Sequence, residues 1–202
     1  MQSRPVRKGE VVLIRHGETP WSLSGQHTGR TDLPLTENGC RVAKLLEPLF
    51  SDVEFARVLA SPLERARMTC ELSGLGARMQ IDPDLCEWNY GEYEGLTPEE
   101  IEGRSPGWII FTDGCPGGET PAQVRFRVDR LIQAVRAAPG RVALFAHGHL
   151  FRVFVARWLG LPVSHACHFV LNTSTLSLLG YYRGIPSVKC WNAPIEEERF
   201  LE

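Results

Sequence analysis

Two histidines of this chain stand in closely similar surroundings. His16 follows the apolar run VVLI and an arginine, His147 follows the apolar run VALFA, and each histidine is followed by glycine. A lone histidine in such a turn is more often a structural residue than a functional one. The repetition changes that balance, because strand ends at one edge of a sheet can bring both imidazoles to a single site.

Arginines near the first histidine indicate the chemistry. Arg15 directly precedes His16, and Arg65 follows the next apolar run along the chain. A guanidinium stays protonated and can donate two parallel hydrogen bonds to a phosphate, whose charge must be neutralised while a nucleophile attacks phosphorus. We therefore expect the two arginines to hold one phosphate. We also expect the adjacent positive charge to lower the pKa of His16, which keeps the imidazole neutral and nucleophilic near pH 7.

The elements that must position these residues alternate between strand and helix. Apolar runs predict strands at 11–14, 58–60 and 142–145, and helical spacing predicts a helix around 42–49. Ser61-Pro62 predicts a helix start, with the helix running to about Gly74. Capping sequences at Thr97 and Thr120 predict two more, and residues 149–159 a further one. Alternating segments near 175–182 and 187–191 predict a terminal pair of strands.

This alternation predicts an α/β fold, a three-layer α/β/α sandwich around a mostly parallel sheet. Ligands of such sheets bind beyond the carboxyl ends of the strands, where both His-Gly turns are expected to lie. No repeat or linker divides the sequence, so we expect a single domain over residues 1–202.

Charge and hydropathy exclude several classes of partner. The 22 Lys and Arg against 24 Asp and Glu lack the basic surplus of a nucleic-acid binder. No segment has the roughly 20 apolar residues of a membrane span, and the first ten residues are not those of a signal peptide. The six cysteines are irregularly spaced, as in proteins with reduced thiols. We therefore expect a cytoplasmic protein that binds neither nucleic acid nor membrane and acts on a small metabolite.

Five segments carry a family resemblance. In chain order they read VLIRHGETPW, SGQHTGRTDLPLTENG, SPLERARMT, CEWNYGEYEG and FAHGHLFR. Their order and separation resemble the histidine phosphatase superfamily, also called phosphoglycerate mutase-like, over most of the chain. The resemblance implies the phosphoglycerate mutase-like fold and a reaction that passes through a phosphorylated histidine.

The resemblance also implies a role for each matching residue. His16 would be the phosphorylated nucleophile, and Arg15, Arg65 and His147 would complete its phosphate pocket. Glu87 matches the acidic residue that protonates the leaving oxygen and then activates water, a role that typically contributes about 10²- to 10⁴-fold in rate.

Four further positions match substrate contacts of similar enzymes. Ser22, Thr28 and Gly29 are three of them, and mutases more often carry asparagine at the first. His149 stands where mutases commonly carry asparagine, so its role is either to orient His147 or to touch the substrate, unless it makes only a local structural hydrogen bond.

We expect no metal and no cofactor. His165, Cys167 and His168 do not match the spacing of a zinc site, and no acidic cluster suited to Mg²⁺ is present in the sequence. Arg67 is as consistent with a helix surface as with the phosphate pocket, because residues 65 and 67 fall on different helical faces. Arginines and histidines are thus expected to neutralise the phosphate.

Phosphatase, mutase and non-catalytic binder are the functions to separate. The mutases carry an insertion after the YG motif whose basic residues grip the substrate, whereas this chain has one arginine, Arg104, between Gly95 and Gly118. A short lid admits water, which favours hydrolysis. The chain most resembles sedoheptulose-1,7-bisphosphatases and broad acid phosphatases. We therefore expect a phosphatase whose substrate is a sugar phosphate or bisphosphate, and the alternative function is that of a phosphoglycerate mutase. A non-catalytic phospho-ligand binder would need neither nucleophile nor proton donor and is disfavoured.

Overall fold

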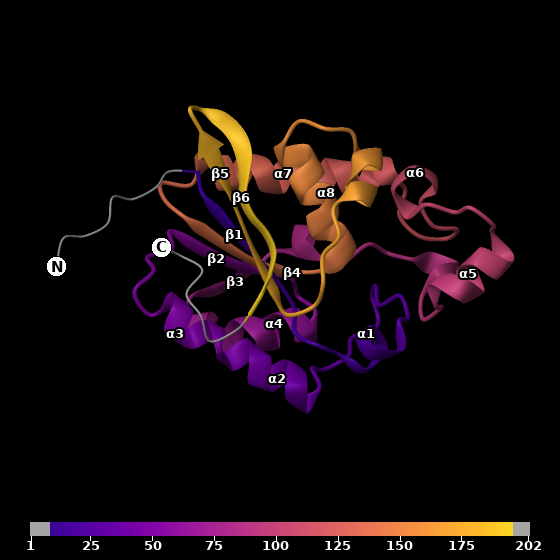
Figure 1. The fold of residues 1–202 in the computed structure, drawn as a ribbon, viewed down its shortest axis with the longest axis horizontal. Helices are drawn as coiled ribbons and strands as arrows, with labels where there is room; N and C mark the ends of the chain where they lie inside the picture. Colours follow the sequence, from indigo (N-terminus) through magenta and orange to yellow (C-terminus); the bar gives the residue numbers. More distant parts are fainter. Residues whose placement is uncertain (1–8, 196–202) are drawn as a thin grey trace.

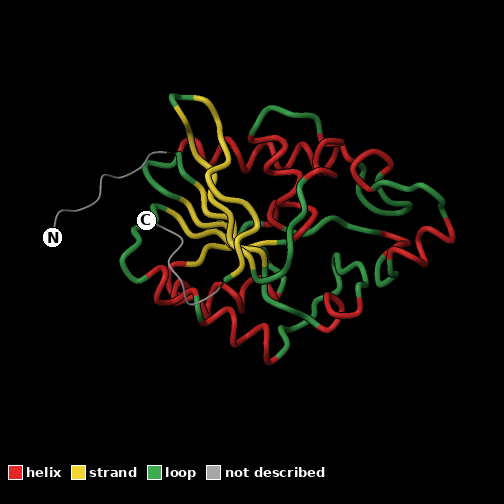
Figure 2. The backbone as a smooth tube through the Cα atoms, viewed as in Figure 1, coloured by secondary structure: helices red, strands yellow, loops and turns green. Residues whose placement is uncertain are grey.

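A twisted six-stranded sheet forms the centre of the protein (Figure 2). The computed structural model describes residues 9–195. The strand order is β3-β2-β4-β1-β5-β6, with β1–β4 parallel, β5 antiparallel to β1, and β6 antiparallel to β5. The mostly parallel sheet expected from the sequence is therefore confirmed. The strands are β1 (Val11–Arg15), β2 (Arg57–Ala60), β3 (Met79–Ile81), β4 (Val142–Ala146), β5 (Thr175–Tyr182) and β6 (Ile185–Pro194).

The pairing of β1 with β4 brings the two His-Gly turns together. Arg15 at the end of β1 is in register with Ala146 at the end of β4. The backbone N–H of His16 then donates to the carbonyl oxygen of Ala146 at 3.0 Å. Both turns consequently start side by side at the same edge of the sheet, as the sequence predicts.

Helices cover both faces of the sheet and make the three-layer arrangement (Figure 1). One face carries α7 (Pro121–Ala137) and α8 (Gly148–Trp158), and the other carries α2 (Glu37–Lys44), α3 (Leu46–Phe50) and α4 (Glu64–Cys70). Alternate residues of β1 serve the two layers: Val11 and Leu13 belong to one hydrophobic cluster, Val12 and Ile14 to the other. Burial on both faces explains why β1 is a continuous apolar run.

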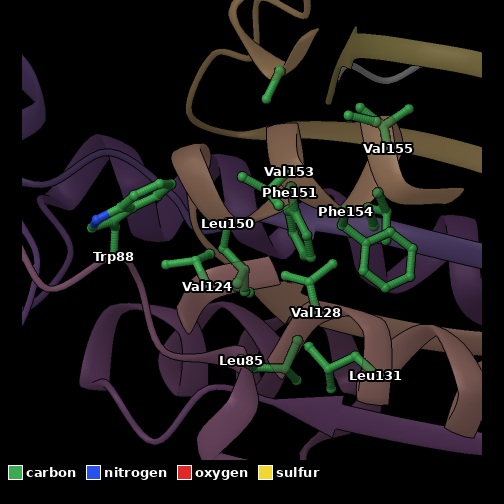
Figure 3. Close-up of a cluster of buried hydrophobic side chains, with 14 of the residues drawn as sticks. Leu85, Trp88, Val124, Val128, Leu131, Leu150, Phe151, Val153, Phe154 and Val155 are labelled. Carbon is green, nitrogen blue, oxygen red and sulfur yellow. The ribbon is translucent and has the colours of Figure 1, made fainter. Parts of the chain in front are cut away.

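The larger cluster holds the start of α8 in place (Figure 3). Val128 of α7 lies next to Phe151 and Phe154 of α8, and all three are fully buried. Burying a side chain of this size contributes about 1.5–3 kcal/mol. The N-terminus of α8, which directly follows His147, is therefore fixed by packing on the core.

Three helices begin at threonine caps followed by proline. Thr19 caps α1 (Pro20–Ser24), Thr97 caps α5 (Pro98–Arg104) and Thr120 caps α7, each as a capping box. The helices at Thr97 and Thr120 were predicted and are confirmed, whereas α1 was not predicted from the sequence. In Figure 1, α1, α5 and α6 (Ile110–Asp113) lie beyond one end of the sheet.

The predicted helix start at Ser61-Pro62 is wrong. Helix α4 begins at Glu64 without a side-chain cap, and after Cys70 the chain makes a π-helical turn in which Gly74 has φ 79°. Ser61 still belongs to the end of the sheet and not to the helix, since its backbone N–H donates to the carbonyl of Phe145 at 2.9 Å and the N-cap position is Leu63. Its hydroxyl is also engaged, as shown below.

Short 3-10 turns complete the chain, at Gly76–Arg78, Pro83–Leu85, Gly91–Tyr93 and Val163–His168. Within residues 9–195 no helix has the length and apolar character that would let it cross a membrane.

Candidate active site

His16 has a fixed ring orientation. Its side chain is 4% exposed, and Nδ1 lies 2.8 Å from the carbonyl oxygen of Gly17. A carbonyl oxygen only accepts, so Nδ1 carries the proton and the neutral ring has its lone pair on Nε2. Nε2 makes no hydrogen bond with any residue in 9–195. The free nitrogen is therefore the one that can act as a nucleophile.

His147 lies beside His16 and is held by two partners. The ring centroids of the two histidines are 5.2 Å apart. Nε of Arg65 donates to Nδ1 of His147 at 3.2 Å, and Nε2 of His147 lies 2.8 Å from Oγ of Ser61. Because Nδ1 accepts, the proton is on Nε2, which donates to the serine hydroxyl.

Arg65 is fully buried and its donors are largely committed to the protein. Besides the bond to His147, its Nη atoms donate to the carbonyl oxygens of Thr31 at 3.0 Å, Thr28 at 3.1 Å and Gly29 at 2.9 Å. Since arginine has five N–H donors, one remains. Arg65 thus braces the loop that follows α1 and supplies positive charge from beneath the site.

Arg15 presents its charge more directly. Its Nη1 donates to the carbonyl oxygen of Leu171, whereas its buried Nε has no hydrogen-bond partner in residues 9–195. A Cβ on Gly148 would lie 3.0 Å from Cζ of Arg15, so the glycine after His147 allows this guanidinium to approach closely. An unpartnered buried N–H is costly, so this donor is a candidate for binding an anion.

Glu87 is anchored at the N-terminus of α8. Its carboxylate accepts backbone hydrogen bonds from Trp88 at 2.8 Å and from His149 and Leu150 at 3.0 Å each. A carboxylate is favoured there by the helix dipole and by N–H groups that lack partners within the helix. Glu87 as a whole is 4% exposed, and it lies at the wall of the site.

A cavity of about 300 Å³ joins these groups. Arg15, His16 and Glu87 line it, but Arg65 and His147 are not among the described residues of its wall. Arg65 and His147, which were also expected at the phosphate pocket, form a buried layer in which His147 packs against His16. The other lining residues are Ser22, Gly25, Gln26, His27, Thr28, Tyr90, Pro98, Gly148, His149, Arg152 and Leu171.

A cluster of three rings, those of His27, Tyr90 and His149, lines part of the cavity. The ring of His149 stacks on His27 with a centroid distance of 5.8 Å and an interplanar angle of 8°. Tyr90 and His149 share a hydrogen bond of 2.5 Å between the phenol oxygen and Nδ1. His149 thus faces the cavity, and it makes no hydrogen bond to His147 in the part of the chain that the structure describes.

Arg152 is a second cation of the wall. Its Nε and Nη2 donate to the carbonyl oxygens of Ala166 and Cys167, each at 3.2 Å, and Cζ lies 4.6 Å from the ring centroid of Phe111. Its Nη1 donates to no group in residues 9–195. The guanidinium is therefore fixed on two sides and free on one.

Burial is the main reason why the histidines are neutral. It lowers the pKa of His16 well below its usual value, and the charges of Arg65 and Arg15 lower it further. Arg15 thus lowers the pKa of His16 as expected, but less than burial and Arg65 do. Burial likewise lowers the pKa of His147 and of His149 well below the usual range, helped mainly by Arg65 for the first and by Arg152 for the second.

The remaining sequence-predicted residues differ in position. Ser22 and Thr28 line the cavity, but the Ser22 hydroxyl donates to the carbonyl of Thr19 at 2.9 Å within its capping box. Gly29 is not among the described wall residues. A Cβ there would lie 2.4 Å from Oε2 of Glu94, so the glycine is explained by close packing.

The comparisons with known proteins agree with this geometry. The family model described as Histidine phosphatase superfamily (branch 1) matches residues 11–194. The chain belongs to the histidine phosphatase superfamily. It is 38% identical to an acid phosphatase of Mycobacterium tuberculosis over 89% of this chain and 90% of the relative. It is 39% identical to sedoheptulose 1,7-bisphosphatase of Saccharomyces cerevisiae over 79% of this chain and 70% of the relative.

Solved structures of this superfamily share the fold. The structure of an open reading frame product from Mycobacterium tuberculosis superposes with a TM-score of 0.87 at 34% identity, covering 93% of this chain and 98% of the other. The resemblance inferred from five sequence segments is confirmed, and the protein is a phosphoric monoester hydrolase of this superfamily.

Sequence reasoning about this histidine phosphatase missed several side chains of the site. Tyr90 and Arg152 lie within segments already singled out, CEWNYG and FAHGHLFR, but were given no role. The spacing of His149 and Arg152 was a usable signal, because residues three apart on a helix share a face. His27 and Ser61 gave no such signal, since only the tertiary structure brings them to the site.

The structure assigns no metal site to the described residues. No three His, Cys, Asp or Glu side chains in residues 9–195 are grouped so that they could hold an ion. His165 and His168 have ring centroids 6.0 Å apart, on the 3-10 turn Val163–His168. Metal-independent chemistry stays a prediction, which is tested below.

Proposed function

We propose that this histidine phosphatase hydrolyses a sugar phosphate or sugar bisphosphate through a phosphohistidine at His16. The observation that carries the proposal is the hydrogen bond from Nδ1 of His16 to the Gly17 carbonyl at 2.8 Å, which leaves Nε2 unprotonated beside the cavity. Burial keeps the ring neutral by lowering its pKa. A neutral imidazole with a directed lone pair is the form that attacks phosphorus.

In the first half of the reaction, Nε2 of His16 forms a bond to phosphorus while the bond from phosphorus to the sugar oxygen breaks. Arg15, with its unpartnered Nε, neutralises the non-bridging oxygens, and Arg65 and His147 support that charge from the buried layer. The leaving alkoxide takes a proton from Glu87, which lines the same cavity.

In the second half, water enters once the alcohol has left. Glu87 now removes a proton from the water, whose oxygen attacks phosphorus and breaks the bond to Nε2. Inorganic phosphate is released, and Glu87 is protonated again for the next cycle. The backbone donors from Trp88, His149 and Leu150 hold the carboxylate in one position throughout both steps.

The wall of the cavity supports a small polyol substrate with acidic groups. Its volume of about 300 Å³ suits a small metabolite. Arg152 also lines the cavity, and its Nη1, which donates to no group in residues 9–195, suits a second phosphate or a carboxylate. The names of two relatives, an acid phosphatase and a sedoheptulose 1,7-bisphosphatase, point in the same direction.

A cytoplasmic location is part of the proposal. All six cysteines are free. Cys70, Cys86 and Cys115 are buried, and Cys70 and Cys115 belong to the two hydrophobic clusters. Free thiols are the usual state in a reducing compartment, where small phosphorylated metabolites are also found.

The test is a phosphate-release screen of the full chain over sugar mono- and bisphosphates, phosphoglycerates and nucleotides, with chelator present. Each candidate is also assayed for phosphoryl transfer to an acceptor, which detects a mutase. We expect hydrolysis of sugar phosphates with kcat/KM above that for the other classes and no mutase turnover. Release from nucleotides alone, or mutase turnover exceeding hydrolysis, would contradict the proposal.

A further inference from the structure

Thr69 joins the turn after β1 to the helix that carries Arg65. Its side chain lies on α4 and is fully buried. Oγ accepts a hydrogen bond from the backbone N–H of Gly17 at 3.0 Å and donates its own proton to the carbonyl oxygen of Arg65 at 2.7 Å. One hydroxyl therefore uses both its donor and an acceptor site between two segments that are distant in sequence.

Gly17 needs such an anchor. A Cβ at this position would lie 2.9 Å from the carbonyl oxygen of Gly39, so only glycine fits. Glycine is also the residue with the widest choice of backbone conformations, which makes an unanchored carbonyl free to rotate. The carbonyl of Gly17 is the group that accepts the hydrogen bond from Nδ1–H of His16.

We infer that Thr69 is a positioning residue for the nucleophile: its hydroxyl fixes Gly17 so that the Gly17 carbonyl keeps the His16 proton on Nδ1 and the lone pair on Nε2. The inference rests on the proposed role of His16 as nucleophile. Without the hydroxyl, the buried N–H of Gly17 loses its acceptor, and the glycine must turn to find another. The Nδ1 proton then loses its fixed acceptor as well.

Three variants of the full chain separate the hydroxyl from its surroundings. Thr69→Val removes the hydroxyl at nearly constant shape, and Thr69→Ser removes the methyl group but keeps the hydroxyl. Ser73→Ala is the matched control, because Ser73 is also buried and its hydroxyl donates at 2.7 Å to the carbonyl of Cys70, with no link to Gly17.

The decisive measurement is the tautomer of His16, read from the imidazole nitrogen shifts of protein labelled with ¹⁵N-histidine. The His16 signals are assigned by their loss in His16→Ala. We expect a single Nδ1–H tautomer in the wild type, in Thr69→Ser and in Ser73→Ala, and a mixture of tautomers in Thr69→Val. For Thr69→Val we also expect kcat on p-nitrophenyl phosphate to fall by up to about 10²-fold, with KM nearly unchanged.

Several outcomes would overturn the inference. The first is that Thr69→Val keeps the wild-type tautomer of His16 and the wild-type kcat. The second is that Thr69→Ser or Ser73→Ala loses as much kcat as Thr69→Val does. If Thr69→Val does not fold, Thr69→Ala against Thr69→Ser provides the same comparison. A wild-type protein that hydrolyses no phosphomonoester would defeat the proposed function, whereas the tautomer comparison would still decide the role of Thr69.

Discussion

Nε of Arg65 donates a hydrogen bond to Nδ1 of His147 at 3.2 Å. This bond makes Nδ1 an acceptor and so leaves the imidazole proton on Nε2, where Ser61 Oγ lies 2.8 Å away. The guanidinium therefore does more than provide positive charge, because it also selects the tautomer of the second histidine. The arginine, rather than a carboxylate or a carbonyl, sets the state of this ring.

We expect Arg65→Lys to lower both the stability and the activity of the protein, although the substitution keeps the positive charge. An ammonium group cannot reproduce the planar set of bonds to His147 and to the carbonyls of Thr28, Gly29 and Thr31. We expect the free energy of unfolding to fall by at least about 2 kcal/mol and kcat by about 10²-fold or more. Urea unfolding and steady-state kinetics measure both.

Arg67→Lys is the control for this substitution. Arg67 lies on the same helix, and its buried Nε has no hydrogen-bond partner within residues 9–195. We expect Arg67→Lys to leave kcat near the wild-type value. Equal effects of the two substitutions would mean that the bonds of Arg65 do not matter to the site.

The stability of the protein should fall as pH drops below about 6.5. Burial lowers the pKa of His16, His147 and His149 well below the usual value, so the folded state binds fewer protons than the unfolded chain in this range. Stability then rises with pH, by up to about 1.4 kcal/mol per pH unit for each histidine and about 4 kcal/mol for the three. It levels off above about pH 7.5, where both states are neutral.

Urea unfolding between pH 8 and pH 5 measures this slope in a range where most carboxylates stay ionised. The His149→Gln variant removes one of the three groups and should reduce the slope by about 1.4 kcal/mol per pH unit at most. A stability that is independent of pH over this range would show that these histidines titrate alike in the folded and unfolded states.

Arg152 should matter for substrates that carry a second acidic group. Arg152 lines the cavity, and the hydrogen bonds of Nε and Nη2 keep its guanidinium in place. We expect Arg152→Met to raise KM about 10-fold or more for a sugar bisphosphate, because one charge-assisted hydrogen bond is lost, and to change KM for p-nitrophenyl phosphate little. Arg125→Met, at an exposed position of α7, is the control.

Much of the fold could be predicted because local signals and tertiary structure agree. The apolar runs of β1 and β4 are continuous since both faces of each strand are buried, and the Thr-Pro sequences at Thr97 and Thr120 cap helices as their chemistry requires. The juxtaposition of His16 and His147 followed from the rule that parallel strands end at one edge.

Some parts of the site could not be predicted because their polar side chains bond to residues that are distant in the sequence. Ser61 looked like a helix cap, but its hydroxyl accepts a hydrogen bond from Nε2 of His147 instead. Arg65 was expected to hold the phosphate, but its bonds to the carbonyls of the loop after α1 were not predicted. In both cases the partner of the polar group lies in a distant segment of the chain, so the sequence around the residue does not indicate the bond.

Activity should persist in EDTA and should not increase with Mg²⁺. Arg15 in the cavity wall, with Arg65 beneath it, provides the positive charge that metal ions provide in other phosphatases. Phosphate release is measured before and after prolonged dialysis against chelator, with a zinc-dependent phosphatase treated in parallel. Loss of activity that a metal restores would refute the arginine-based mechanism.

Two substitutions should separate the nucleophile from the proton donor. We expect His16→Ala to abolish turnover and covalent labelling by substrate phosphate, since no other group offers a lone pair in the same position. We expect Glu87→Gln to retain slower phosphorylation, because a good leaving group such as nitrophenolate departs without a proton whereas a sugar alkoxide does not.

The Glu87→Gln variant should therefore lose more rate on a sugar phosphate than on p-nitrophenyl phosphate, by a factor within the 10²- to 10⁴-fold range typical of general acid catalysis. Single-turnover kinetics ensure that phosphorylation of His16 is the step compared for both substrates. Thermal unfolding of Glu87→Gln checks that the lost charge at the N-terminus of α8 has not disordered the site. Equal losses on the two substrates would remove Glu87 from the proton-donor role. His147, whose Nε2 proton now points to Ser61, would then be the next candidate, because a change of partner from Ser61 to the leaving oxygen would let it donate.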